Sequence, residues 1–525
     1  FFSPVILAQA LGNLGMDACE ISLISSDMQD VTGSEDLCPE KATLIGPCKV
    51  IAQEYPGIHC RSIDITLSRS SARQEELLIQ QLRNELFENR GEIMVALRGR
   101  HRWVQVFEPH KVSDDLTENP FRSQGVYLIT GGLGGLGLEL ARYLAQTTQA
   151  SLVLTARTLL PPRHTWNDLL AKQGEETVLG RKINKVRELE ALGAKVLVMQ
   201  ADVTSEEQMH AVIQHTLDIF GTIHGVLHTA GVPAAGLMQL RTRDSAMEVL
   251  APKMLGVRVL ERVLHGLSLD FLVLFSSLSS ITGGGPGQVD YCAANAFLDA
   301  YAHCHATRHG MTVAIDWGEW QWDAWDAGLE GYPPEARTYF RERRQQFGIH
   351  FAEGMEALRR VLSSRLTRVV VCTEDFPAMV EGSKKSSIAT IIEEIQVFRQ
   401  AQRDRQDGKA RAIHYARPNL PTPYIAPENK IERQIVAIWE ALLGIEQIGV
   451  HDNFFELGGH SLIGTQLITR LRQVFQVDIR LVTLFDAPTV AELAVEVELL
   501  LIEEIERMST QDTEEADVCV PEMNL

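Results

Sequence analysis

The chain has 525 residues, of which 45% are hydrophobic and 22% charged, and its formal net charge is −20. This length exceeds one ordinary hydrophobic core, so we expect two to four domains of a soluble globular protein. The acidic balance argues against a nucleic-acid-binding surface, since no basic stripe offsets it. The eight cysteines are scattered without a CxxC pair, which argues against a disulfide framework and favours a reducing, cytoplasmic setting.

The beginning of the chain predicts a supporting α/β unit in residues 1–120. The chain starts at Phe1 rather than methionine, and its first apolar run is too short to span a membrane, so we expect a piece of a larger polypeptide. Strand-like runs alternate with a helical pattern, at 18–25, 92–97 and 103–107 for the strands and 72–89 for the helix. Without a phosphate-binding glycine loop, this unit predicts structural support rather than chemistry.

Residues 125–145, GVYLITGGLGGLGLELARYLA, read as strand, glycine turn and helix. Glycines let the backbone approach a pyrophosphate, and the helix start offers amides to that anion, so the segment predicts a dinucleotide site. Arg157 follows the next strand, 20 residues past Gly137, where an arginine would accept a 2′-phosphate; this favours NADPH over NADH, the alternative being a solvated loop charge. The predicted cofactor-binding residues, with small ones beside the nicotinamide, are Thr130, Gly131, Gly132, Leu133, Gly134, Gly135, Leu136, Gly137, Arg157, Ala230 and Gly231.

The segment 271–299, FLVLFSSLSSITGGGPGQVDYCAANAFLD, carries the predicted chemistry. A buried strand ends in a serine pair, and a helix after the glycine-rich loop bears Tyr291 and Asn295, which share one helical face because they are four residues apart. A phenol to donate a proton, a hydroxyl to hold the oxygen and an amide to order them suit the reduction of a carbonyl by a hydride-donating cofactor. Ser277 is the preferred hydroxyl and Ser276 the alternative.

These motifs resemble the ketoreductase domain of modular polyketide synthases, a branch of the short-chain dehydrogenase/reductase superfamily. The superfamily's usual lysine four residues after the tyrosine is replaced here by Asn295, and Lys253 in APKMLG matches the earlier lysine of the polyketide branch. The resemblance implies that Lys253 lowers the pKa of Tyr291, and it places Asp202 and Val203 against adenine. It also implies a doubly wound Rossmann-type α/β domain at 121–380, preceded by a cofactor-free subdomain.

Three features of the reductase region stay open. The loop before Tyr291 is one residue longer than usual in the family, and VPAAG at 232–236 lacks the acidic signature of one stereochemical class, so the handedness of the hydroxyl is undetermined. His303, Cys304, His305 and His309 suggest a metal only weakly, because positions 303 and 305 point apart on a helix. The tryptophan-rich run DWGEWQWDAWDAGLEGYPP is either a substrate-covering lid or a satellite hydrophobic cluster.

The composition changes after residue 380. A proline-rich connector at 381–427 leads to an all-α domain at 428–508, with helices expected at 430–443, 461–475 and from 489 onward, and to an acidic tail at 509–525 that predicts disorder. The loop HDNFFELGGHSL resembles the carrier motif of nonribosomal peptide and hybrid polyketide synthases, which implies covalent 4′-phosphopantetheine on Ser461. Otherwise Ser461 is a plain helix N-cap.

Together these features predict an NADPH-dependent reduction of a carrier-bound 3-oxoacyl thioester to the 3-hydroxyacyl form. The resemblance implies further partners: a phosphopantetheinyl transferase, a ketosynthase, an acyltransferase and a condensation domain. Neither nucleic acid nor membrane is an expected partner. Two alternatives remain, namely a 2-oxoacyl substrate as in depsipeptide synthetases and a silent reductase scaffold with only the carrier active.

Overall fold

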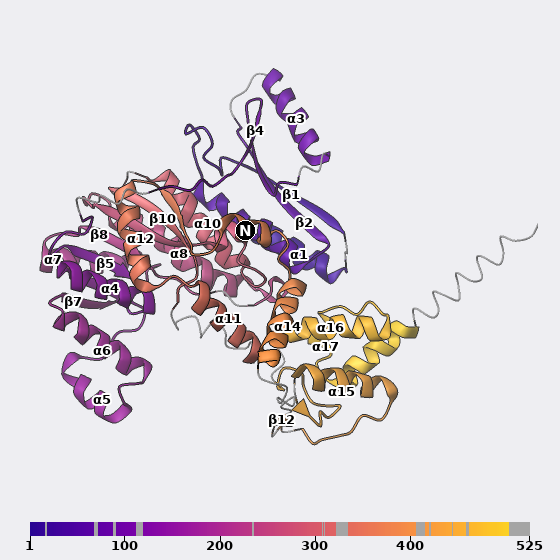
Figure 1. Ribbon diagram of the computed structural model, residues 1–525. Coiled ribbons are helices and arrows are strands. Elements are labelled where there is room, and N and C mark those ends of the chain that lie inside the picture. Colours follow the sequence, from indigo (N-terminus) through magenta and orange to yellow (C-terminus); the bar gives the residue numbers. More distant parts are fainter. Residues whose placement is uncertain are drawn as a thin grey trace, which may run out of the picture. The chain divides into compact units, whose positions relative to one another are not determined.

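The computed structural model describes residues 1–15, 18–67, 72–87, 91–111, 119–233, 236–306, 308, 310–321, 334–405, 415–418, 420, 422–443, 445–457 and 461–502. They fall into two compact units, one drawn mostly from residues 1–387 and the other mostly from residue 388 onward. The element labels are those of Figure 1. Among the described helices, none is long and apolar enough to cross a membrane.

A four-stranded sheet forms the amino-terminal part of the first unit. Its order is β1 (Cys19–Ser26), β2 (Ile58–Ile65), β3 (Met94–Arg98) and β4 (His101–Val104), with the first three strands parallel and β4 antiparallel to β3. The same segment of the chain contains the helices α1 (Phe2–Asn13), α2 (Ile45–Glu54) and α3 (Ala72–Phe87). The last predicted strand starts two residues earlier than expected, because a tight turn at 99–100 pairs Arg98 with His101.

A seven-stranded sheet, parallel throughout, forms the rest of the first unit. Its order is β11-β10-β9-β8-β5-β6-β7, so the strand order reverses between β5 and β8. Ligands of such sheets bind outside the carboxyl ends of the strands at this switch point. The strands are β5 (Val126–Thr130), β6 (Ser151–Ala156), β7 (Lys195–Gln200), β8 (Gly225–His228), β9 (Phe271–Ser277), β10 (Met311–Trp317) and β11 (Arg368–Val371).

Helices cover both faces of the larger sheet. One face buries alternate strand residues against α4 (Gly135–Thr148), α6 (Val178–Ala191) and α12 (Phe351–Ser364). The other face packs against α7 (Glu206–Phe220), α8 (Arg243–Val263) and α10 (Val289–Cys304). Because both faces are covered, the strands are continuous apolar runs, as expected of a buried parallel sheet. The doubly wound Rossmann-type prediction is therefore confirmed.

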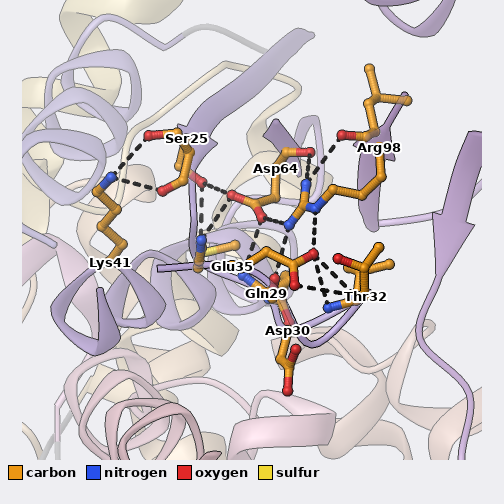
Figure 2. A network of polar contacts seen from close by, with 12 residues as sticks. Ser25, Gln29, Asp30, Thr32, Glu35, Lys41, Asp64 and Arg98 are labelled. Carbon is orange, nitrogen blue, oxygen red and sulfur yellow. Dashed lines mark hydrogen bonds and ion pairs between the residues drawn. The ribbon is translucent and has the colours of Figure 1, made fainter. Parts of the chain in front are cut away.

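A buried ion network fills the carboxyl edge of the smaller sheet (Figure 2). Arg98, at the end of β3, donates to the Asp64 carboxylate over 2.6 Å and to Glu35 over 2.9 Å. Asp64, near the end of β2, also accepts the hydroxyl of Ser25 and the backbone N–H groups of Met28 and Gln29. Desolvation raises the pKa of Glu35, but the hydrogen bonds from Arg98 and the Thr32 amide have the larger combined effect and lower it to about 2.

The second unit is mainly helical around one hydrophobic core, as predicted, but it also has a two-stranded parallel sheet of β12 (Tyr415–Ala416) and β13 (Ile445–Glu446), which the all-α prediction did not include. It contains α15 (Lys430–Leu443), α16 (Ser461–Phe475), α17 (Thr483–Asp486) and a further helix at 490–502. Trp439 and Phe454 meet edge to face at its centre, with ring centroids 5.1 Å apart. The other α-helices of the described residues are α5 (Trp166–Gln173), α9 (Ser279–Thr282), α11 (Pro334–Phe347), α13 (Phe376–Ser383) and α14 (Ile388–Arg405).

Candidate active site

The glycine turn lies between β5 and α4, at the switch point of the larger sheet. Gly131 has a φ of +69°, a conformation that favours glycine, and a Cβ there would stand 3.0 Å from the Ala230 backbone. A Cβ on Gly137 would stand 2.7 Å from the Gly131 carbonyl oxygen, so the turn and helix pack too closely for side chains. Gly134 and Gly135 are exposed at the start of α4, whose cap carries no side-chain hydrogen bond. The Gly134 amide donates to the Gly131 carbonyl over 2.8 Å and closes the turn, so the first amides of α4, from Gly135 on, form the cradle that fits a pyrophosphate.

The other predicted cofactor contacts lie at the carboxyl ends of neighbouring strands. Ala230 and Gly231 follow β8, and a Cβ on Gly231 would come within 3.1 Å of the Lys253 side chain. Arg157 directly follows β6, and its side chain is exposed. The arrangement brings the expected positions for phosphate, nicotinamide and 2′-phosphate to one edge of the sheet.

Asp202 and Val203, expected near adenine, both make contacts within the protein. Asp202 accepts from the backbone and hydroxyl of Thr204, and its own amide donates to Gln208. Val203 is buried in the core beside Gly256. These contacts fix the turn after β7, and adenine contact by either residue remains a prediction.

Lys253 and Asn295 meet behind the tyrosine although they are 42 residues apart in the chain. The buried ammonium of Lys253 donates to the Asn295 side-chain oxygen over 2.5 Å and to the Phe275 carbonyl over 2.7 Å. The Asn295 amide nitrogen donates to the Tyr291 carbonyl at 2.9 Å and to the Ser279 hydroxyl at 3.1 Å. Every polar atom of the Asn295 side chain is therefore engaged, which fixes the ring-bearing turn of α10.

Tyr291 stands between Lys253 and Ser277. The Lys253 nitrogen lies 5.2 Å from the centre of the tyrosine ring. Burial raises the pKa of Tyr291, and hydrogen bonds with the side chains of Asn295 and Ser277 act in the opposite direction. The expectation that Lys253 lowers this pKa is not met here, because burial lowers the pKa of Lys253 itself to about 7 and its donors point to Asn295 and Phe275.

The two candidate serines lie in different surroundings. Ser276 is buried, and its hydroxyl donates to Asp299 of α10 over 2.6 Å. Asp299 is also paired with Arg368, whose guanidinium holds Asp316 at 2.8 Å. Ser276 is thus part of a buried cluster that ties β9 to α10, whereas Ser277 faces Tyr291 and is partly exposed. This geometry favours Ser277 as the hydroxyl of the site.

The histidine-rich end of α10 shows no metal site in the part of the chain that the structure describes. His303 contacts Thr367, and His305 stacks on Tyr301 with ring centroids 4.1 Å apart. His309 lies outside the described residues. The two described histidines therefore point apart, as their spacing predicted.

The tryptophan-rich run is divided. Trp317 and Trp320 are buried in the core, their ring centroids 4.7 Å apart. This part of the run forms the hydrophobic cluster rather than the lid. Residues 322–333, with the other two tryptophans, lie outside the described ranges, so the lid stays a prediction for them.

A cavity of about 1060 Å³ in the first unit lies away from these residues. It is bounded by β3, β4, β11 and α12, and none of the predicted catalytic or cofactor-binding residues lines it. We place the candidate active site at the switch point nevertheless, because the polar groups that could perform chemistry converge there.

In the helical unit, two residues of the carrier-like motif before Ser461 have structural roles. Asp452 is buried, accepts the Gly449 amide over 2.8 Å and pairs with Arg417. Phe454 is buried against Trp439. These contacts fix the loop that leads to α16, which begins at Ser461. The side chain of Ser461 and residues 458–460 are outside the structural description.

Several residues that complete the site were not singled out from the sequence. Ser279 holds Asn295, and His228 pairs with the Thr130 hydroxyl over 2.7 Å. Asp299 had a readable signal, because it lies four and eight residues after Asn295 and Tyr291 on the same helix. Ser279 and His228 gave no such signal, since only the fold brings their strands and loops together.

The chain matches two family models, "KR domain" over residues 125–322 and "Phosphopantetheine attachment site" over residues 433–495. It is 34% identical over 278 residues to 6-methylsalicylic acid synthase of Aspergillus terreus. This match covers 53% of this chain and 15% of that protein. It is 25% identical over 473 residues to polyketide synthase PksN of Bacillus subtilis, covering 88% of this chain and 8% of that one. The chain thus spans only a small part of these relatives.

A solved structure of A-type ketoreductases from a modular polyketide synthase is also similar. It is 26% identical, the match covers 71% of this chain and 74% of that one, and the TM-score is 0.58. The likeness agrees with the doubly wound sheet and the helices on its two faces.

Proposed function

Since the chain carries a KR domain followed by a phosphopantetheine attachment domain, we propose that it is the reductase and carrier segment of a polyketide or hybrid polyketide/nonribosomal peptide synthase module. Its substrate is a 3-oxoacyl thioester and its product the 3-hydroxyacyl thioester. The observation that carries this proposal is the assembly of Lys253, Asn295, Tyr291 and Ser277 beside the glycine turn.

Each residue has a role that its contacts support. When bound, the nicotinamide dinucleotide supplies the hydride to the ketone carbon. Tyr291 gives its phenolic proton to the carbonyl oxygen, and Ser277 donates a hydrogen bond to the same oxygen. Asn295 holds Lys253 and the turn that bears Tyr291. Proton donation by the tyrosine is favoured while Lys253 is charged, because the cation stabilises the phenolate that proton donation leaves.

The dinucleotide is NADPH in this proposal. The exposed Arg157 after β6 suits a 2′-phosphate, and the first amides of α4, from Gly135 on, suit the pyrophosphate. A Cβ at Gly131 or Gly137 would press on the backbone of the cradle, which agrees with a site built for close approach.

The carrier supplies the substrate. A phosphopantetheinyl transferase modifies Ser461, and the tethered thioester reaches the reductase at high effective concentration, so the pocket need not bind it tightly. Upstream and downstream partners are a ketosynthase, an acyltransferase and, in a hybrid module, a condensation domain. The segment divides near residues 120, 380, 427 and 508 and acts in the cytoplasm.

The test is the intact mass of the carrier acylated on the Ser461 arm, before and after addition of NADPH. We expect a gain of two hydrogens with a 3-oxoacyl group, and none in the Tyr291→Phe variant. Ser461→Ala should abolish loading while the reductase still consumes NADPH with a 3-oxoacyl pantetheine thioester.

The same assay separates the alternatives. Reduction of a 2-oxoacyl group in preference to the 3-oxoacyl group would assign the chain to a depsipeptide-type synthetase. Absence of NADPH consumption with either thioester, while Ser461 is loaded normally, would assign a silent reductase scaffold and overturn the proposal.

A further inference from the structure

Glu54, in the last turn of α2, joins two loops of the larger domain. Its carboxylate accepts the backbone N–H of Met238 over 2.5 Å and that of Gly287 over 2.8 Å. Met238 belongs to the loop after β8, residues 229–242, which we call the β8 loop; residues 234–235 of it are outside the described ranges. Gly287 belongs to the loop after β9, residues 278–288, which we call the β9 loop.

The two loops approach each other where Glu54 holds them. A Cβ on Gly287 would lie 3.4 Å from the amide nitrogen of Gly236. Gly287 and Gly236 have φ values of +83° and +115°, conformations that other residues rarely adopt. The β8 loop starts at the residues expected beside the nicotinamide, and the β9 loop runs from Ser277 to the helix of Tyr291. The loops therefore flank the place where a ketone must lie.

The rest of α2 contacts the same region. Gln53 donates its side-chain amide to the Thr282 carbonyl over 2.9 Å, and the Lys49 ammonium donates to the Ile281 carbonyl. A Cβ on Gly46 would stand 2.3 Å from the Val289 carbonyl, so α2 packs directly on the first turn of α10. One helix of the cofactor-free subdomain thus touches both loops and the helix that bears Tyr291.

Charged and titratable groups surround Glu54 from the other elements. Arg241 pairs with Asp290 over 2.6 Å, and the Tyr55 hydroxyl donates to Gln239 over 2.6 Å. Burial raises the pKa of Glu54 to about 7, and its two backbone partners and Arg241 act in the opposite direction. Burial of a carboxylate costs free energy, and the two backbone hydrogen bonds of Glu54 offset that cost. Its role is therefore to hold the two loops rather than to keep the surface soluble.

We propose that Glu54 is a positioning residue of the reductase, which fixes the β8 and β9 loops together and so orients the ketone relative to Tyr291 and the nicotinamide. The amino-terminal subdomain then sets the geometry and the stereochemical outcome of the reaction as well as supporting the fold. This inference rests on the proposed function.

The test is Glu54→Gln in the full chain. A glutamine offers one acceptor oxygen and a donor amide, so it can hold only one of the two loops. Because small misplacements of a bound substrate cost about a hundredfold in rate, we expect kcat/KM for a 3-oxoacyl pantetheine thioester to fall about ten- to hundredfold. The diastereomer ratio of the hydroxy product should become less biased, while the Kd for NADPH and the melting temperature change little.

Two further measurements separate positioning from a fold defect. Hydrogen–deuterium exchange of peptides covering 236–242 and 283–290 should become faster in Glu54→Gln without a change in the strands of the larger sheet. Glu54→Asp, which keeps both acceptors on a shorter side chain, should recover part of the stereochemical bias. Glu76→Gln, at an exposed glutamate of α3, is the matched control and should behave as wild type.

The outcomes are distinguishable from those of the proposed function. If wild type reduces neither ketoacyl thioester, the proposed function fails. If wild type is active and Glu54→Gln has unchanged kcat, KM, diastereomer ratio and loop exchange, the positioning role is overturned and the function stands.

Discussion

The first unit contains two sheets whose parallel strands end at edges that are built in opposite ways. At the edge of the larger sheet, α4 begins at exposed glycines, and no side chain caps its first amides. At the edge of the smaller sheet, Arg98, Asp64 and Glu35 fill the corresponding position with a buried ion network (Figure 2). A sheet of parallel strands with helices therefore does not by itself bind a cofactor. Binding depends on whether side chains fill the carboxyl ends of the strands or leave them open.

The largest effect is expected at the open edge. Tyr291→Phe removes the proton donor but keeps the ring, so we expect kcat to fall by a factor of about 10²–10⁴. The Kd for NADPH, measured by fluorescence, should stay within about twofold, because the glycine turn is unaltered. Activity close to that of wild type would show that another group donates the proton.

Breaking the filled edge should cost stability rather than chemistry. Arg98→Met leaves Asp64 and Glu35 buried without their cation, and we expect the free energy of unfolding to fall by about 3–5 kcal/mol in urea denaturation. Arg262→Met, which breaks an exposed pair with Glu206, is the matched control and should cost about 0–1 kcal/mol. Equal effects of the two substitutions would contradict the structural role of the network.

The ion network of the smaller sheet also makes the free energy of unfolding depend on pH. Because the pKa of Glu35 is lowered from 4.5 to about 2, its stabilising contribution is present above pH 4.5 and is lost as the pH falls toward 2. In Glu35→Gln the free energy of unfolding should therefore vary less with pH between 4.5 and 2 than in wild type. Parallel pH curves for the two proteins would refute this assignment.

The open edge should also determine the preference for NADPH over NADH and the number of dinucleotides bound per chain. Arg157→Ala removes one charged contact to a 2′-phosphate, so we expect the Kd for NADPH to rise about tenfold and that for NADH to stay unchanged. Calorimetric titration should give one dinucleotide per chain, since the larger sheet alone has the glycine cradle among the sheets of the described residues. A second dinucleotide site, or equal losses for both cofactors, would contradict the comparison.

Lys253 carries a second pH dependence of the free energy of unfolding. Burial lowers its pKa from 10.5 to about 7, so between those values the unfolded chain binds a proton that the folded chain lacks, and stability rises with pH. Replacing it in Lys253→Met should remove up to about 1.4 kcal/mol per pH unit of this slope between pH 7 and 9. Curves that differ by a constant would show that Lys253 does not titrate in this window.

The sequence determined the elements that follow from local pattern. The apolar strand before the glycines, the four-residue spacing of Tyr291 and Asn295, and the amphipathic helix at 430–443 could all be read directly, because periodicity reflects burial. The doubly wound fold was implied by the resemblance to a family. The assignment of Lys253 to the site likewise came only from that resemblance, and its contact with Asn295 is known only from the structure.

Only the tertiary structure decided which residues meet across long separations. Ser276 and Ser277 are neighbours in the chain, and the packing of β9 against α10 assigns one to Asp299 and leaves the other facing Tyr291. Glu54 reaches two loops more than 180 residues away. Local pattern records which face of an element is buried, whereas hydrogen bonds between distant elements depend on how the chain returns, and that is fixed only when the whole domain folds.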